Sequence, residues 1–127
     1  MACRGAQRGT SCLAMGVAPV DLYRNGNASS ARLDHVRING PTRDVDTYDQ
    51  NGITWVRANG KGVSSEGSPD PNWNGKPWRF DAGLSFPDSL RLFPDDPGHW
   101  VWEPVQDMPL ASYQDALAIA NANFVKV

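Results

Sequence analysis

The sequence predicts an α+β fold in a single domain. A chain of 127 residues is long enough to bury one hydrophobic core. Its 12 glycines and 10 prolines favour many turns, and therefore strands rather than a helical bundle. The clearest helical pattern follows all the strand-like segments. We expect residues 18–127 to form this domain and residues 1–17 to be a flexible N-terminal arm.

The strand-like segments are short runs of β-branched and aromatic residues between turn residues. They are 17–24, 53–57, 63–65, 77–80, 91–93 and 99–103. Between the third and the fourth, residues 66–76 are rich in Gly, Pro, Asn and Ser, which predicts an exposed loop carrying Trp73.

Two segments early in the chain are harder to interpret. Residues 29–36 have a serine cap and inward-facing apolar residues, which predicts a short helix. Residues 44–52 are acidic, but an EF-hand would need an oxygen ligand and then glycine where the chain has Tyr48 and Asp49. We therefore interpret 44–52 as a solvated loop.

The C-terminal helix has the clearest pattern. Asp107 is a candidate N-cap, and Pro109 suits the first helical turn. One apolar face is expected from residues at helical spacing: Leu110, Tyr113, Leu117, Ala120 and Phe124.

The aromatic strand at 99–103 alternates two kinds of side chain. His99 and Glu103 should point to one face, and Trp100 and Trp102 to the other. Two tryptophans need a core, whereas an imidazole and a carboxylate need water, a partner or a ligand. We expect this strand to form one wall of a cleft with its back in the core.

The N-terminal arm, 1–17, contains Arg4 and Arg8 and no acidic residue, which is similar to a weak mitochondrial targeting segment. A disordered arm is the alternative. Cys3 and Cys12 have neither CxxC spacing nor a nearby histidine, which argues against a structural zinc site. They are either two free thiols or one disulfide that closes a small loop.

Charge and hydropathy exclude two classes of partner. The net charge is −2 and there is no run of Lys or Arg, so strong nucleic-acid binding by a basic face is not expected. No apolar run approaches the roughly 18 residues of a membrane span. We expect a soluble protein with no bound metal, and the sequence leaves its compartment open.

An ordered series of short motifs spans residues 20–125. It comprises Leu22-Tyr23-Arg24, Asn51-Gly52, Gly62-Val63-Ser64-Ser65, Trp78 to Gly83, Phe86 to Leu90, His99 to Pro104, and Met108-Pro109 followed by the helix. In order and spacing this series resembles the small type VI secretion toxins with an ADP-ribosyltransferase-like fold, which have fungal relatives.

The resemblance implies a compact fold of split antiparallel sheets around a cleft that binds NAD as a substrate. It implies one of two enzymes. The first is a mono-ADP-ribosyltransferase, which belongs to the glycosyltransferase class, and the second is an NAD glycohydrolase. A toxin of this kind would act inside a target cell or in the cytoplasm, on a macromolecular target that the sequence does not identify. It would also imply an immunity protein that neutralises it.

The site that the resemblance implies has a cofactor-binding part. Arg24 matches the first-strand arginine, whose guanidinium can hold a phosphate of NAD. A strand-end arginine in a surface ion pair is the ordinary alternative. Ser64 and Ser65 match the hydroxyl position, where one serine could contact the ribose and the other could orient a catalytic carboxylate. Tyr23 could stack on a ring of NAD, although such aromatics usually belong to the core.

The implied catalytic residues are Glu103, His99 and Ser65. A fixed carboxylate at Glu103 would stabilise the positive charge that develops when the nicotinamide–ribose bond breaks. The bacterial toxins lack a clear glutamate at this position, so Glu103 is either a transferase residue or an exposed strand carboxylate. His99 matches the toxins better, and it could hold the ribose or act as an acid or base.

Two alternatives remain open at this stage. A toxin of the same fold could use a ligand other than NAD or act by binding its target. Alternatively, the five tryptophans and many Asn and Asp residues could belong to a glycan-binding module. Trp55 and Trp78 are expected in the core, whereas Trp73 is expected to be exposed.

Overall fold

The structure is a computed structural model that describes residues 14–74 and 76–127. Within these residues the chain forms ten strands and one helix, so the α+β prediction is confirmed. In order, the elements are β1 (Ala14–Met15), β2 (Leu22–Gly26), β3 (Thr47–Gln50), β4 (Ile53–Val56), β5 (Val63–Glu66), β6 (Lys76–Phe80), β7 (Leu90–Asp96), β8 (His99–Pro104), β9 (Met108–Pro109), α1 (Leu110–Asn121) and β10 (Val125–Lys126).

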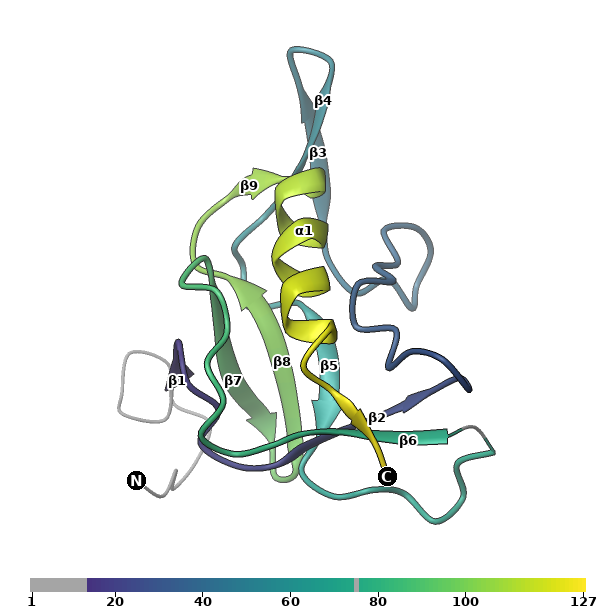
Figure 1. Cartoon of the computed structure of the whole chain (residues 1–127). Helices are drawn as coiled ribbons and strands as arrows, with labels where there is room; N and C mark the ends of the chain where they lie inside the picture. The colour runs from purple at the N-terminus through teal and green to yellow at the C-terminus, as the bar shows by residue number, and fades with distance from the viewer. Residues whose placement is uncertain (1–13, 75) are drawn as a thin grey trace.

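The strands form two antiparallel sheets. The larger sheet has the strand order β1-β7-β8-β5-β2-β6-β10, and the smaller has the order β3-β4-β9. The helix α1 lies over β5 and β8, while the β3–β4 hairpin projects beyond the body of the molecule (Figure 1). The Tyr113 hydroxyl of α1 fixes this packing, because it donates a 2.6 Å hydrogen bond to the Trp102 carbonyl and accepts one of 3.1 Å from the Val63 amide.

An aromatic cluster fills the space between the large sheet and the helix. The Trp102 ring contacts Phe80, Phe86 and Phe124, with ring centroids 5.4, 5.2 and 6.3 Å away. Trp102 and Phe80 are fully buried. The prediction that Trp100 and Trp102 point into the core is therefore confirmed, since Trp100 is also buried.

The acidic segment 44–52 is not a solvated loop, and this prediction is wrong. Thr47–Gln50 pairs with Ile53–Val56 as a hairpin whose turn residues are Asn51 and Gly52. Both have positive φ, 53° and 78°. An Asn-Gly pair is the strongest short-range signal for such a turn. That local turn preference prevails over the polar composition.

The predicted helix at 29–36 is also wrong, because residues 29–36 form an irregular loop. The Asn27 side chain accepts hydrogen bonds from the Ser29 and Ser30 amides, at 2.9 and 2.8 Å. Arg32 then has a φ of 61°, which no right-handed helix contains. The side chain of Asn27 thus captures the amides that would begin a helix.

The C-terminal helix is confirmed, but its ends differ from the prediction. Pro109 is the N-cap residue and no side chain caps the helix. Asp107 is not a cap, since its carboxylate accepts from the Ala58 amide and the Tyr48 hydroxyl. The helix ends at Asn121, and Phe124 lies beyond it, although Phe124 is buried in the core as expected.

At the N-terminal side, β1 pairs with β7, so the last residues of the expected arm join the large sheet. Cys3, Cys12 and the segment similar to a targeting peptide lie outside the described residues. Among the described residues, no helix is both long and apolar enough to cross a membrane.

Candidate functional site

A cleft of about 240 Å³ opens beside strands β2 and β5. Two strands and one loop build it. Its lining residues are Tyr23, Arg24 and Asn25 of β2, Ser64, Ser65 and Glu66 of β5, and Trp73 of the loop that follows β5. Four of the residues predicted for the site, Tyr23, Arg24, Ser64 and Ser65, therefore line one cleft.

The register of the strands decides which side chains share a face. Tyr23 pairs with Glu66, and Glu66 pairs with His99. Directly paired residues of antiparallel strands point to the same face. Tyr23, Glu66 and His99 therefore lie in one row across three strands, and Ser64 is on the same face two residues before Glu66.

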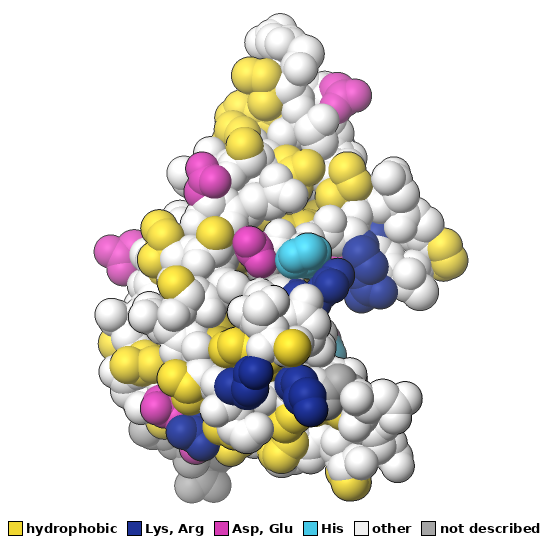
Figure 2. All heavy atoms as spheres, turned by 45° about the vertical axis from the view of Figure 1, so that its right-hand side comes forward, with side chains coloured by type: hydrophobic (Ala, Val, Ile, Leu, Met, Phe, Trp, Pro, Cys, Tyr) yellow, Lys and Arg dark blue, Asp and Glu magenta, His cyan; other side chains and the backbone are white. Residues whose placement is uncertain are grey.

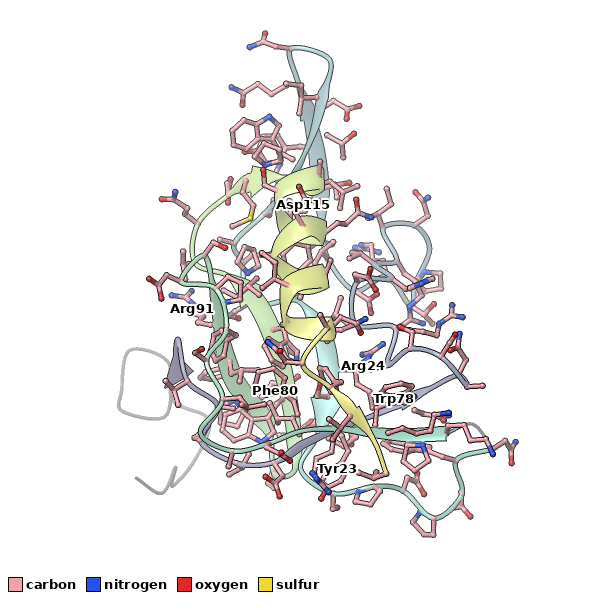
Figure 3. All side chains as sticks on the ribbon, viewed as in Figure 1. Tyr23, Arg24, Trp78, Phe80, Arg91 and Asp115 are labelled. Carbon is pink, nitrogen blue, oxygen red and sulfur yellow. The ribbon has the colours of Figure 1, made fainter. Side chains whose placement is uncertain are left out.

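Arg24 points to the other face of β2 from Tyr23, as Figure 3 shows. Its Nε donates to the Ala31 carbonyl at 2.9 Å, one Nη donates to the Arg32 carbonyl at 3.0 Å, and the other donates to the Ser64 carbonyl. Of its five N–H donors, three are thus used within the described part of the chain. The guanidinium ties β2 to β5 and to the loop after β2.

Charges of both signs surround Arg24. Burial lowers the pKa of the Arg24 guanidinium, and the nearby Arg37 and Arg32 add to this, while Asp44 opposes it. No carboxylate of the described residues lies within ion-pair distance of Arg24. Figure 2 shows Lys and Arg side chains above and below a deep indentation of one face. Such a region attracts anionic ligands.

The two serines of β5 have different environments. Ser65 is buried, and its hydroxyl oxygen accepts a 2.8 Å hydrogen bond from the indole N–H of Trp102. Ser64 is half-buried, and its hydroxyl forms no hydrogen bond with the described residues. The hydroxyl of Ser65 is thus part of the core, and that of Ser64 is the one left for a ligand.

Glu103 is fully buried and forms an ion pair with Arg91, whose Nε lies 2.5 Å from its Oε1. The alternation of β8 is as predicted, but the expectation that its second face walls a cleft needs correction. Val101 is also buried, and only His99 at the end of the strand is accessible. Arg91 lies on β7, across the sheet from Arg24 (Figure 3).

His99 and Glu103 share a face without meeting. Four residues of strand separate their Cα atoms by roughly 13 Å. The His99 ring instead lies between two carboxylates, with Nδ1 2.5 Å from Asp95 and Nε2 3.5 Å from Glu66. The structure therefore places His99 at the margin of the cleft and Glu103 away from it.

Glu66 is the site residue that sequence reasoning missed. The sequence pattern predicts Glu66 in the loop at 66–76, whereas it is the last residue of β5. The sequence did contain a signal for this. If the strand that begins at Val63 continues to Glu66, then Ser64 and Glu66 lie on one face and Ser65 lies on the other. The cross-strand pairing with His99 could not be read from the sequence.

Among the described residues, no group of three or more His, Cys, Asp or Glu side chains has the geometry to hold a metal ion. No protein-family model matches this chain, and no curated protein sequence matches it. The cleft and the motif series are therefore the features that indicate a function.

Proposed function

We propose that this protein is a toxin-like mono-ADP-ribosyltransferase that binds NAD in the cleft beside β2 and β5. It breaks the nicotinamide–ribose bond and transfers ADP-ribose to an intracellular target. The observation that carries the proposal is that Tyr23, Arg24 and Ser64 line one cleft although 40 residues separate Arg24 from Ser64. The two antiparallel sheets agree with the ADP-ribosyltransferase-like fold that belongs to the proposal.

The size of the cleft suits half of a dinucleotide. Pockets that enclose a drug-sized ligand usually measure about 300–1,000 Å³, and this one measures about 240 Å³. A second hollow of about 360 Å³ shares Trp73 with it and is otherwise lined by Pro69, Asp70, Pro71 and Pro77. The nicotinamide half of NAD would occupy the cleft, and the adenosine half would cross Trp73 into the second hollow.

Each lining residue has a role that its chemistry permits. The Tyr23 ring is half-buried and can stack on the nicotinamide. The Ser64 hydroxyl can bond to the ribose. The Arg24 side chain leaves β2 on the opposite face but reaches the Ser64 carbonyl on β5, and its two remaining N–H groups can donate to a phosphate.

A labelling experiment tests this function. Purified protein is incubated with a cell lysate and NAD labelled in its adenosine half, and transfer to macromolecules and release of free ADP-ribose are both measured. Ser112→Ala, an exposed position on α1, is the matched control for Ser64→Ala. We expect label with the wild type and the control, and much less with Ser64→Ala.

Binding gives the second half of the test. Tyr23→Ala should weaken NAD binding by about tenfold, the usual effect of losing one stacking ring. If the wild-type protein neither binds NAD in calorimetry nor transfers label, the proposed function is wrong. The purified protein itself would be the bait with which to search for a neutralising partner protein.

A second candidate function is that the same cleft holds a ligand other than NAD. Three N–H groups of Arg24 already donate to backbone carbonyls, which favours this candidate, because fewer N–H groups then remain to bind a phosphate. Growth inhibition that depends on Tyr23 but persists without NAD binding would support this candidate. The glycan-binding alternative has less support, because Trp100 and Trp102 are buried in the core.

A further inference from the structure

Three ionisable side chains lie in a row at the margin of the cleft. His99 Nδ1 is 2.5 Å from a carboxylate oxygen of Asp95, and His99 Nε2 is 3.5 Å from one of Glu66. All three side chains are between 36% and 39% exposed, so ligands can reach them. Glu66 is the member of the row that also lines the cleft.

The backbone holds this row in place. Glu66 and His99 are directly paired between β5 and β8. The next residue, Gly67, donates a 2.8 Å hydrogen bond from its amide to the carbonyl of Gly98 in the β7–β8 turn. Gly98 has a φ of 76°, which allows the tight turn that brings Asp95 back beside His99. The row is therefore fixed by strand register and not by side-chain packing alone.

A second observation concerns the only other glutamate of the chain. Glu103 is fully buried against Arg91 and lies about 13 Å along β8 from His99. A carboxylate in that environment is already compensated by a cation. Among the described residues, the His99 ring is the only basic side chain within ion-pair distance of Glu66, at 3.5 Å.

We propose that Glu66 is the catalytic carboxylate of the cleft, and that His99 and Asp95 are positioning residues that orient it. This inference rests on the proposed function. It replaces Glu103, the residue that the motif series suggests, with a carboxylate that the strand register brings into the cleft beside Tyr23 and Ser64.

The reaction follows from the charge of each group. The bond between ribose C1′ and the nicotinamide nitrogen breaks, and its electron pair leaves with neutral nicotinamide. The positive charge that develops on the ribose is stabilised by the Glu66 carboxylate. An oxygen or nitrogen of the acceptor, or water, then bonds to C1′, and the proton that it loses passes to Glu66 and on to solvent.

His99 has a separate task in this scheme. An imidazole with an N–H on each nitrogen can donate to both carboxylates at once, so it can join Asp95 to Glu66. Asp95 fixes the ring through a 2.5 Å contact with Nδ1, which directs Nε2 toward one oxygen of Glu66 at 3.5 Å. The other oxygen of Glu66 remains for the ribose.

The test separates binding from chemistry with two isosteric variants. Glu66→Gln should lower nicotinamide release from NAD by about 100-fold or more, the usual loss when one charge-stabilising group is removed. Its NAD dissociation constant should stay within about threefold of the wild type, because the group acts in the transition state. Asp115→Asn, an exposed carboxylate on α1 (Figure 3), is the control and should behave as wild type in both.

Positioning by His99 needs its own readout. His99→Ala should lower nicotinamide release by roughly tenfold, and added free imidazole should restore part of it, since the site is open to solvent. A merely structural histidine would not be rescued in this way. Failure of rescue in a folded His99→Ala protein would remove the positioning role.

The possible results separate the role of Glu66 from the binding and cleavage of NAD as such. A wild type that binds and cleaves NAD, with Glu66→Gln cleaving at the same rate, overturns the inference and leaves the proposed function intact. A wild type that does not bind NAD overturns both. A large loss of cleavage in Glu66→Gln with unchanged NAD binding supports the inference.

Discussion

The indole N–H of Trp102 donates a 2.8 Å hydrogen bond to the hydroxyl oxygen of Ser65, and both side chains are buried. Trp102 lies at the centre of the aromatic cluster, between Phe80, Phe86 and Phe124. Ser65 is therefore the polar partner of the largest side chain in the core. Ser64, one residue earlier, faces the opposite side of β5.

This difference predicts opposite effects of two neighbouring substitutions. Ser65→Ala leaves the Trp102 N–H unpaired in the core, which should lower the free energy of unfolding by about 1–3 kcal/mol. Ser64→Ala should change it by no more than about 0.5 kcal/mol, as for most surface positions. Urea unfolding of both variants measures this. Equal stabilities would show that the indole finds another partner.

The effects on activity should be the reverse of the effects on stability. In the labelling assay, Ser64→Ala should lose transfer, and Ser65→Ala should keep it under conditions where the protein stays folded. A loss confined to Ser65→Ala would mean that the buried hydroxyl belongs to the site after all.

Tyr113 gives a prediction about stability at high pH. Burial raises the pKa of its phenol above the ordinary 10.0. Above pH 10 the unfolded chain therefore loses a proton that the folded chain keeps, so the stability that Tyr113 contributes is present below pH 10 and is lost as the pH rises further. Unfolding free energy measured between about pH 8 and pH 11 should fall steeply at the upper end.

The matched comparison uses phenylalanine. Tyr113→Phe loses the bonds to Val63 and Trp102 and should be less stable at neutral pH by about 1–3 kcal/mol, but its alkaline decline should be shallower. Tyr48→Phe, at the surface, should keep most of the decline. If the unfolding free energy of Tyr113→Phe falls as steeply at high pH as that of the wild type, another group causes the decline.

The sequence predicted those parts of the fold that local pattern determines. Alternation of His99 to Glu103 gave the two faces of β8 correctly, and helical spacing located α1. The elements missed were those where one side-chain contact overrides the local pattern. Asn27 captures the amides at 29–30, and Asp107 binds Ala58 and Tyr48 instead of capping the helix.

The site was less predictable than the fold for a physical reason. A strand pattern gives the face of each side chain, but it does not give the partner across the sheet. The alternation along β8 predicts that Glu103 and His99 act together, because they share a strand and a face. Pairing of β5 with β8 instead brings Glu66 to His99, and pairing of β7 with β8 brings Arg91 to Glu103.

Substitutions of Arg24 can distinguish a role in stability from a role in NAD binding. From the sequence we would expect Arg24→Ala to abolish NAD binding with little loss of stability. In the structure its guanidinium bonds to the carbonyls of Ala31, Arg32 and Ser64. Two of these contacts are part-buried and the one to Arg32 is exposed, so removing the charged donor should lower the free energy of unfolding by about 1–3 kcal/mol. Arg24→Lys should recover only part, because an ammonium cannot match the planar fork.

Arg32→Ala is the matched control, because it removes a neighbouring guanidinium and keeps the backbone carbonyl that Arg24 contacts. The Arg32 side chain is exposed and reaches the His35 ring at 3.3 Å, so its loss should change stability by no more than about 0.5 kcal/mol. Urea unfolding and NAD calorimetry on the three variants decide between the roles. If Arg24→Ala unfolds like the wild type yet loses NAD, the guanidinium is a ligand clamp. If it loses stability and NAD together while Arg24→Lys regains neither fully, Arg24 acts on the ligand by holding β2, β5 and the 31–32 loop in place.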